Sequence, residues 1–210
     1  MLWEVFVSHW SILYGLLGHR ITPSRNDVTL CTMKLIVWLG NPWKDYAKHR
    51  HTIGFVIVDD LVDQWWWTWS LKKERWAEVA ECFVDGEKII VAKPLLYMNR
   101  SWWPVQQIAH FYKIAAQDIL IIHDEIDFPV AKIALKLWGR SWGHNGLKDI
   151  MAKLGTQDFW RLRIGIGRPD RDGYQSVSDY VLENFPKAEL DALDDVYGHV
   201  MKGVEDFLGV

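Results

Sequence analysis

Two hydrophobic periods alternate along the chain from residue 33 onward. Short apolar runs bounded by turn residues are typical of buried strands, whereas apolar residues three and four positions apart predict helices. Strand-like runs occupy residues 34–37, 78–85, 88–93, 118–123, 133–137 and 161–167. Helix-like segments occupy residues 52–62, 105–112, 146–154 and 189–208. The chain therefore combines both kinds of element.

The order of these elements predicts an α/β fold. An Asp85-Gly86 turn between two strand-like runs indicates a β-hairpin. Elsewhere strands alternate with helices, a pattern that places helices on both faces of one sheet. We expect a single twisted, mostly parallel mixed sheet with helices on both faces. Residues 33–210 should form this one domain, because no repeat and no Gly/Ser-rich or Pro-rich linker divides them.

The first 32 residues differ from the remainder. Residues 5–18 are apolar but contain His9, and Glu4 stands where a signal peptide carries positive charge. This run is shorter than the roughly 20 residues that span a bilayer. We interpret residues 1–32 as an N-terminal extension outside the natural domain, which would start at Met33. A genuine amphipathic extension is the alternative.

The composition is typical of a globular intracellular protein. Half of the 210 residues are hydrophobic and 24% are charged, so a sizeable core can form and wholesale disorder is disfavoured. The two cysteines, Cys31 and Cys82, are too few for a disulfide scaffold and show no zinc-binding spacing. This usage fits a reducing compartment, and we expect a cytoplasmic protein.

Charge is unevenly distributed although the net charge is only −3. Residues 130–170 contain eight basic and three acidic side chains, whereas the last thirty residues contain seven acidic and two basic ones. A polyanion would therefore bind the middle of the chain and not its C-terminal end. From charge alone, an ordinary solvated surface is the favoured interpretation of this basic stretch.

Four short motifs give the chain a resemblance to a known family. They are residues 33–42 (MKLIVWLGNP), 50–55 (RHTIGF), 123–127 (HDEID) and 143–149 (GHNGLKD). In this order and at this spacing they resemble bacterial peptidyl-tRNA hydrolase, from Met33 to about Phe185. The resemblance implies a monomeric hydrolase that needs no metal or cofactor and does not bind membranes. Its partner would be peptidyl-tRNA, and cleavage of the ester between peptide and tRNA would recycle tRNA released prematurely from ribosomes.

His51 and Asp124 are the candidate catalytic residues. Asp124 follows a buried strand-like run, and ligands of open α/β sheets bind at the carboxyl ends of strands. A histidine oriented by a carboxylate can act as a general base near neutral pH. Taken alone, a histidine in this position is more often a surface residue than a catalytic one. The resemblance implies that His51 activates water and that Asp124 orients it.

The other candidate residues would bind substrate. Asparagine side chains both donate and accept hydrogen bonds without adding charge, although a single asparagine in a turn is often only turn chemistry. The resemblance implies ester contacts for Asn41 and Asn145, with Asn145 also supporting the water or the oxyanion. For Met98 and Tyr97, core packing is an equally good interpretation. The remaining residues assigned by resemblance are Asn99 on the wall beside Met98, Tyr46 near the tRNA end, and Lys136 and Arg163 on the tRNA-facing surface.

The fourteen tryptophans are unusual in number and in place. Several stand where the family's motifs have glycine, and residues 65–67 are tryptophans where a helix should end. Glycine at such turns supplies positive φ or permits close backbone approach, which tryptophan cannot do cheaply. The tryptophans at family glycine positions are Trp38, Trp43, Trp102, Trp138 and Trp142.

One hypothesis explains this pattern through translation. Some bacteria read the codon UGA as glycine, and a translation table that assigns UGA to tryptophan would produce these substitutions. The alternative is a divergent protein with genuine indoles beside its active site. A further departure is Thr52, where the family often has asparagine after the histidine, and it puts one supporting hydrogen bond in doubt.

Other functions are less well supported by the residues. The first rival is a catalytically inactive RNA-binding protein on the same fold, a use known from relatives in chloroplast RNA splicing. The second is a peptidase or amidase of similar fold. No recognised metal-binding spacing is present, so we predict no metal site. The conceivable ligands that lack such spacing are His49, His51, His123, Asp124 and His144.

Overall fold

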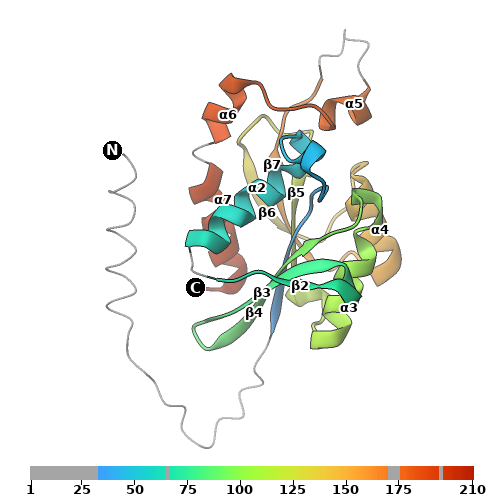
Figure 1. The fold of residues 1–210 in the computed structure, drawn as a ribbon, viewed down its shortest axis with the longest axis vertical. Coiled ribbons are helices and arrows are strands. Elements are labelled where there is room, and N and C mark those ends of the chain that lie inside the picture. Colours follow the sequence, from blue (N-terminus) through green and yellow to red (C-terminus); the bar gives the residue numbers. More distant parts are fainter. Residues whose placement is uncertain (1–32, 65–66, 170–175, 194–195) are drawn as a thin grey trace, which may run out of the picture. The chain divides into compact units, whose positions relative to one another are not determined.

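The computed structural model describes residues 33–64, 67–169, 176–193 and 196–210 (Figure 1). The predicted extension, residues 1–32, lies outside this part, as do Trp65 and Trp66. Seven strands form one sheet in the order β2-β3-β4-β1-β5-β7-β6. The strands are β1 (Lys34–Trp38), β2 (Ser70–Lys72), β3 (Ala77–Val84), β4 (Glu87–Pro94), β5 (Ile119–Glu125), β6 (Ile133–Leu137) and β7 (Trp160–Gly165).

The sheet is parallel at its centre and antiparallel towards both edges. β1 pairs in parallel with β4 and β5, and β5 pairs in parallel with β7. β2, β3 and β4 pair antiparallel in sequence, and β6 pairs antiparallel with β7. The predicted hairpin at Asp85-Gly86 is confirmed, because a two-residue turn can join only antiparallel strands. The sheet is thus mixed, and "mostly parallel" describes only its central strands.

Helices cover both faces of the sheet, as predicted. The residues of β1 alternate between two hydrophobic clusters, since successive side chains on a strand point to opposite faces. Ile36 and Trp38 pack in one cluster, and Leu35 and Val37 pack in the other. The first cluster includes α2 (Ile53–Gln64) and α7 (Val196–Leu208), and the second includes α3 (Trp102–Tyr112) and α4 (Asn145–Leu154).

Most of the predicted elements are confirmed within a few residues. The exception is the segment 189–208, predicted as one helix, where α6 (Lys187–Leu193) and α7 are described on either side of residues 194–195. Strand β2 and helix α5 (Val177–Val181) were missed because three and five residues are too few to show a period. Among the described helices, none is long and apolar enough to cross a membrane.

Candidate active site

The candidate site lies where a short 3-10 turn meets the ends of two central strands. This turn, η2 (Arg50–Thr52), carries His51 and leads directly into α2. Helix α2 starts close to the end of β1. A Cβ on Gly54 would lie only 2.5 Å from the carbonyl oxygen of Leu39, which shows how near the two segments are. Glycine at position 54 therefore allows the approach that brings His51 beside β5, which carries Asp124.

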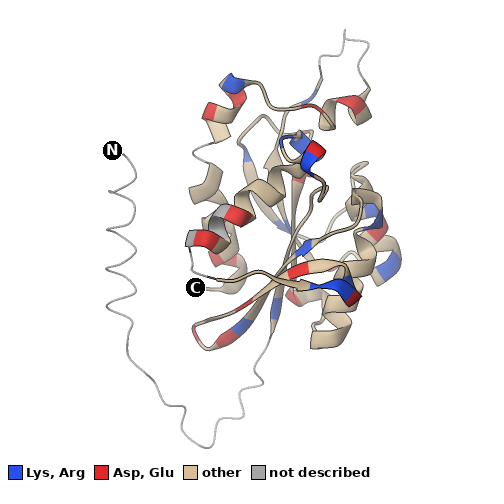
Figure 2. Cartoon of the chain, viewed as in Figure 1, with Lys and Arg blue, Asp and Glu red and all other residues tan. Residues whose placement is uncertain are grey.

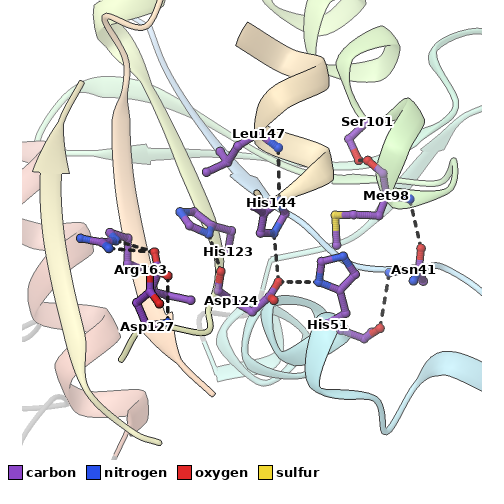
Figure 3. A network of polar contacts seen from close by, with 12 residues as sticks. Asn41, His51, Met98, Ser101, His123, Asp124, Asp127, His144, Leu147 and Arg163 are labelled. Atoms are coloured by element: carbon purple, nitrogen blue, oxygen red, sulfur yellow. Dashed lines mark hydrogen bonds and ion pairs between the residues drawn. The ribbon is translucent and has the colours of Figure 1, made fainter. Parts of the chain in front are cut away.

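His51 and Asp124 form a direct hydrogen bond, which Figure 3 shows. Nδ1 of His51 donates to Oδ1 of Asp124 at 2.8 Å, and both residues are buried. The sequence placed them 73 positions apart, so the fold alone creates the pair. With Nδ1 bonded to the carboxylate, Nε2 is the nitrogen of His51 that can accept a proton.

The electrostatics of this pair favour charge on both partners. Burial opposes protonation of His51, but the charge and hydrogen bond of Asp124 outweigh burial and raise the pKa of His51 above its usual 6.5. Burial also opposes ionisation of Asp124, yet attraction and hydrogen bonds from His51 and His144 hold the pKa of Asp124 well below 3.8. Asp124 is therefore a carboxylate throughout the physiological range.

A second histidine, His144, contacts the same carboxylate oxygen. Its Nε2 lies 3.0 Å from Oδ1 of Asp124, and its ring centroid lies 5.0 Å from that of His51. A third histidine, His123, donates from Nδ1 to the backbone carbonyl of Asp124 at 2.6 Å. Burial is the main reason that the pKa of His123 is lowered to about 3, so His123 stays neutral. Sequence reasoning assigned no role to His123 or His144.

Asn41 is held beside this cluster by two backbone contacts (Figure 3). Its Oδ1 accepts a hydrogen bond from the backbone N–H of Met98 at 3.0 Å. Its own backbone N–H donates to Oγ1 of Thr52 at 3.4 Å. Thr52, the departure from the family pattern, thus connects the turn that carries His51 to the loop that carries Asn41. Since Oδ1 is occupied, the amide NH2 of Asn41 is the group left for a ligand.

The remaining predicted substrate residues take different positions. Asn145 is the first residue of α4, is exposed, and directly follows His144. Asn99 is exposed on η4 (Met98–Arg100), next to buried Met98. Met98 packs against α4 so closely that a Cβ on Gly146 would lie 2.8 Å from its Sδ.

The two tyrosines differ from core residues in their surroundings. Tyr97 is 52% exposed and its ring lies 6.1 Å from that of Trp43, so the core-packing interpretation of Tyr97 is wrong. Tyr46 is half-buried on η1 (Lys44–Tyr46), with its ring edge-on to His49 at 5.1 Å. Both tyrosines lie on turns that connect strands with helices.

The two predicted tRNA-facing cations line one small recess together with His123 and Trp138. Lys136 is exposed on β6, and its ammonium lies 5.2 Å from the ring of Trp138. Arg163 on β7 is already paired, because its Nη2 and Nε lie 2.8 and 2.9 Å from Oε2 of Glu125. Figure 2 shows further basic residues on α4 and acidic residues on α5 and α6.

Three of the conceivable metal ligands do come together, although no sequence spacing indicated it. The ligand atoms of His51, Asp124 and His144 all lie within 4.8 Å of one another. However, Nδ1 of His144 accepts the backbone N–H of Leu147 at 3.2 Å, so its proton is on Nε2. That protonated nitrogen faces Asp124 and has no lone pair for a metal. The hydrogen bonds therefore fit a proton-sharing cluster better than a metal site.

Arg50 is a supporting residue that sequence reasoning missed. Its buried guanidinium lies over the rings of Tyr180 and Phe185, with centroid distances of 4.3 and 4.8 Å. It donates to the backbone carbonyl of Ile166 at 3.2 Å and forms an ion pair with Glu189. This anchors η2 to the C-terminal segment. An arginine directly before the candidate histidine was the only sequence signal.

Two of the tryptophan positions do not need a glycine backbone. Trp38 ends β1 and is fully buried in the core, so it stands on a strand and not in a turn. Its indole N–H, however, has no hydrogen-bond partner among the described residues. Trp43 has φ −88 and ψ 144, an ordinary extended conformation, and is half exposed. Positive φ, one of the two reasons given for glycine at such turns, is therefore absent at both positions.

Comparisons with known proteins agree on one family. The family model described as peptidyl-tRNA hydrolase matches residues 35–209. A peptidyl-tRNA hydrolase of Desulfitobacterium hafniense is 42% identical over 82% of this chain and 91% of its own length. One from Neisseria gonorrhoeae is 45% identical over 84% of this chain and 91% of its own. The crystal structure of peptidyl-tRNA hydrolase from Acinetobacter baumannii matches with a TM-score of 0.78 and 37% identity, covering 85% of this chain and 90% of that one.

Proposed function

The chain belongs to the peptidyl-tRNA hydrolase family, and we propose how its residues cleave the ester that joins a peptide to the 3′ ribose of tRNA. The observation that carries the proposal is the buried hydrogen bond between His51 and Asp124. It fixes the ring and the tautomer of His51, which leaves Nε2 to take a proton from water. The resulting hydroxide attacks the ester carbonyl, and Asp124 stabilises the imidazolium that forms. When the bond to the ribose 3′ oxygen breaks, the imidazolium returns its proton to that oxygen, which releases the peptide with a free carboxylate and tRNA with a free 3′ hydroxyl.

The asparagines hold the substrate around this base. The amide NH2 of Asn41 donates to the substrate near the ester, because its Oδ1 is already bonded to the backbone of Met98. Asn145, at the exposed start of α4, donates to the oxyanion or the attacking water. Asn99 and Met98 form the wall that receives the peptide, with Tyr97 at its edge. Tyr46 lies towards the tRNA end.

The tRNA backbone binds along the basic middle of the chain. Lys136 is exposed and contacts phosphate oxygens directly. Arg163 contributes more weakly, because Glu125 already neutralises it. We also propose that the enzyme acts as a monomer in the cytoplasm. The buried free thiol of Cys82 fits a reducing compartment, and sedimentation equilibrium would test the monomer.

Replacing His51 by alanine tests the mechanism. The variant should lose at least roughly 100-fold in kcat, since a general base contributes that much or more. Its affinity for tRNA should not change, because the base acts on water. His110→Ala, an exposed histidine on α3, is the matched control and should behave as wild type.

Three outcomes would contradict this mechanism or the hydrolytic activity itself. A His51→Ala variant with wild-type turnover would exclude His51 as the base. Loss of wild-type activity with a chelator would indicate metal-dependent chemistry. Wild-type protein that binds tRNA but releases no peptide would favour the RNA-binding rival, which the assembled His51–Asp124 pair disfavours.

A further inference from the structure

We infer that His144 is a positioning residue that holds Asp124 for His51 and ties this carboxylate to the start of α4. The inference rests on the proposed function. Nε2 of His144 donates to Oδ1 of Asp124 at 3.0 Å, and the same oxygen accepts from Nδ1 of His51 at 2.8 Å. Figure 3 shows the two rings approaching Asp124 from different sides.

The tautomer of His144 follows from its place at the end of a helix. His144 is the N-cap of α4, and its Nδ1 accepts the backbone N–H of Leu147. A nitrogen that accepts must carry the lone pair, so the proton is on Nε2 and is donated to Asp124. Protonating His144 would break the helix cap. Both nitrogens are therefore committed, which explains why His51 and not His144 is free to act as the base.

This arrangement couples two parts of the site through one side chain. Asn145 is the first residue of α4, so the cap formed by His144 fixes the backbone that presents it. Gly146 follows and packs against Met98 with no space for a Cβ. The residue that steadies the carboxylate therefore also steadies a proposed substrate-binding asparagine.

Replacing His144 removes the second hydrogen-bond donor to Asp124 and should change the pKa of His51. With one N–H fewer, the Asp124 carboxylate holds the His51 proton more strongly, which raises the pKa of His51. Besides His51 and Asp124 themselves, the titratable groups beside the pair are His144, the N-cap of α4, and His123 on β5, which in turn is affected by the charge of Arg161 on β7. Burial keeps His123 neutral, with its pKa lowered to about 3, so it does not titrate in the assay range.

A crossed pair of variants separates the two contacts of His144. Asparagine at position 144 places its amide near the Nδ1 position and retains the cap, but does not reach Asp124. Glutamine reaches the Nε2 position and can donate to Asp124, but is a poor cap. The measurements are the pH profile of kcat/KM and the melting temperature, with His51→Ala assayed in parallel.

We expect the two readouts to move independently. His144→Asn should keep the melting temperature, lower kcat roughly tenfold, and move the acid limb up by about half a pH unit. His144→Gln should keep the acid limb near wild type and melt about 2–4 °C lower. Wild-type pH profiles for both variants would overturn the inference. If His51→Ala is inactive in that case, the proposed function survives, whereas an active His51→Ala would overturn both.

A second inference rests on a different observation, the backbone conformation of three tryptophans. Trp76, Trp138 and Trp142 have φ values of 49, 54 and 48, in the left-handed region that favours glycine. Only six described non-glycine residues have positive φ, and three of these six are tryptophans. Their side chains are 54%, 59% and 61% exposed, so little burial offsets the backbone strain.

We infer that these three positions carry glycine in the protein made by its own cells, with UGA read as glycine. The coding DNA and mass spectrometry of peptides from the native protein test this. UGA codons at positions 76, 138 and 142, with glycine in the peptides, are the expected result. UGG codons, or peptides that contain tryptophan there, would overturn it.

Discussion

The two turns on either side of Asp124 differ in how firmly their conformations are specified. In η2, the residues Arg50, His51 and Thr52 are all buried, and each has a hydrogen-bond partner from another element. The turn of residues 138–143 instead carries two exposed tryptophans on left-handed backbone. The conformation of η2 is fixed by side-chain contacts. The conformation of residues 138–143 depends instead on whether the residues at positions 138 and 142 tolerate left-handed backbone.

The largest effect is expected from Asp124→Asn. Losing the carboxylate removes the group that orients His51, and the corresponding change in a Ser-His-Asp hydrolase costs kcat roughly 10⁴-fold. Because Asp124 raises the pKa of His51, only the burial that lowers it would remain. The acid limb of kcat/KM, which reports deprotonation of His51, should thus move from above pH 6.5 to a lower pH. An unchanged limb would show that His51 is not the titrating base.

Arg50→Met should destabilise η2, the turn whose conformation is fixed by buried contacts. It removes the ion pair with Glu189 and the donor to Ile166, and breaking a buried pair costs about 3 kcal/mol of unfolding free energy. Urea unfolding would measure the loss, and kcat should fall because η2 carries His51. Lys202→Ala, which removes an exposed pair with Asp206, is the control and should leave the midpoint unchanged. An unaffected Arg50→Met protein would contradict the anchoring role.

Replacing both Trp138 and Trp142 by glycine should stabilise the turn of residues 138–143. Relief of left-handed strain at positions 138 and 142 is expected to add about 1 kcal/mol each to the unfolding free energy. Hydrolysis should rise as well, because this turn leads into Asn145. Trp43→Gly is the matched control, since Trp43 is similarly exposed but has φ −88. Equal stability and activity of the tryptophan and glycine versions would remove the physical support for recoding.

The smallest effect is expected from Lys136→Ala. Losing one phosphate contact should weaken tRNA binding several-fold and reduce the slope of log affinity against log salt by about 1. Lys88→Ala, on β4 and paired with Glu81, is the control and should leave the slope unchanged. Arg163→Gln should change the slope less than Lys136→Ala, because Glu125 already neutralises Arg163. The reverse order would place the tRNA backbone nearer β7 than β6.

Much of the fold could be predicted from local patterns. The strand 133–137 was bounded correctly, and Asp124 was expected at the end of a buried strand, where β5 places it. Apolar periodicity depends on neighbours in sequence, so it can be recognised without knowledge of the fold. Helix α5 and strand β2 were missed because they are short and held by tertiary contacts.

What the sequence by itself determined is the set of elements, the family and the residues that stand in its motifs. The tertiary structure alone decided which of those residues are partners. Asp124 meets His51 across 73 positions and His144 across 20, and Glu125 neutralises Arg163 across 38. It also decided that Trp138 and Trp142, but not Trp38 or Trp43, stand on glycine-like backbone. The physical reason is that periodicity is a short-range property, whereas hydrogen-bond partners and positive φ depend on how distant segments pack.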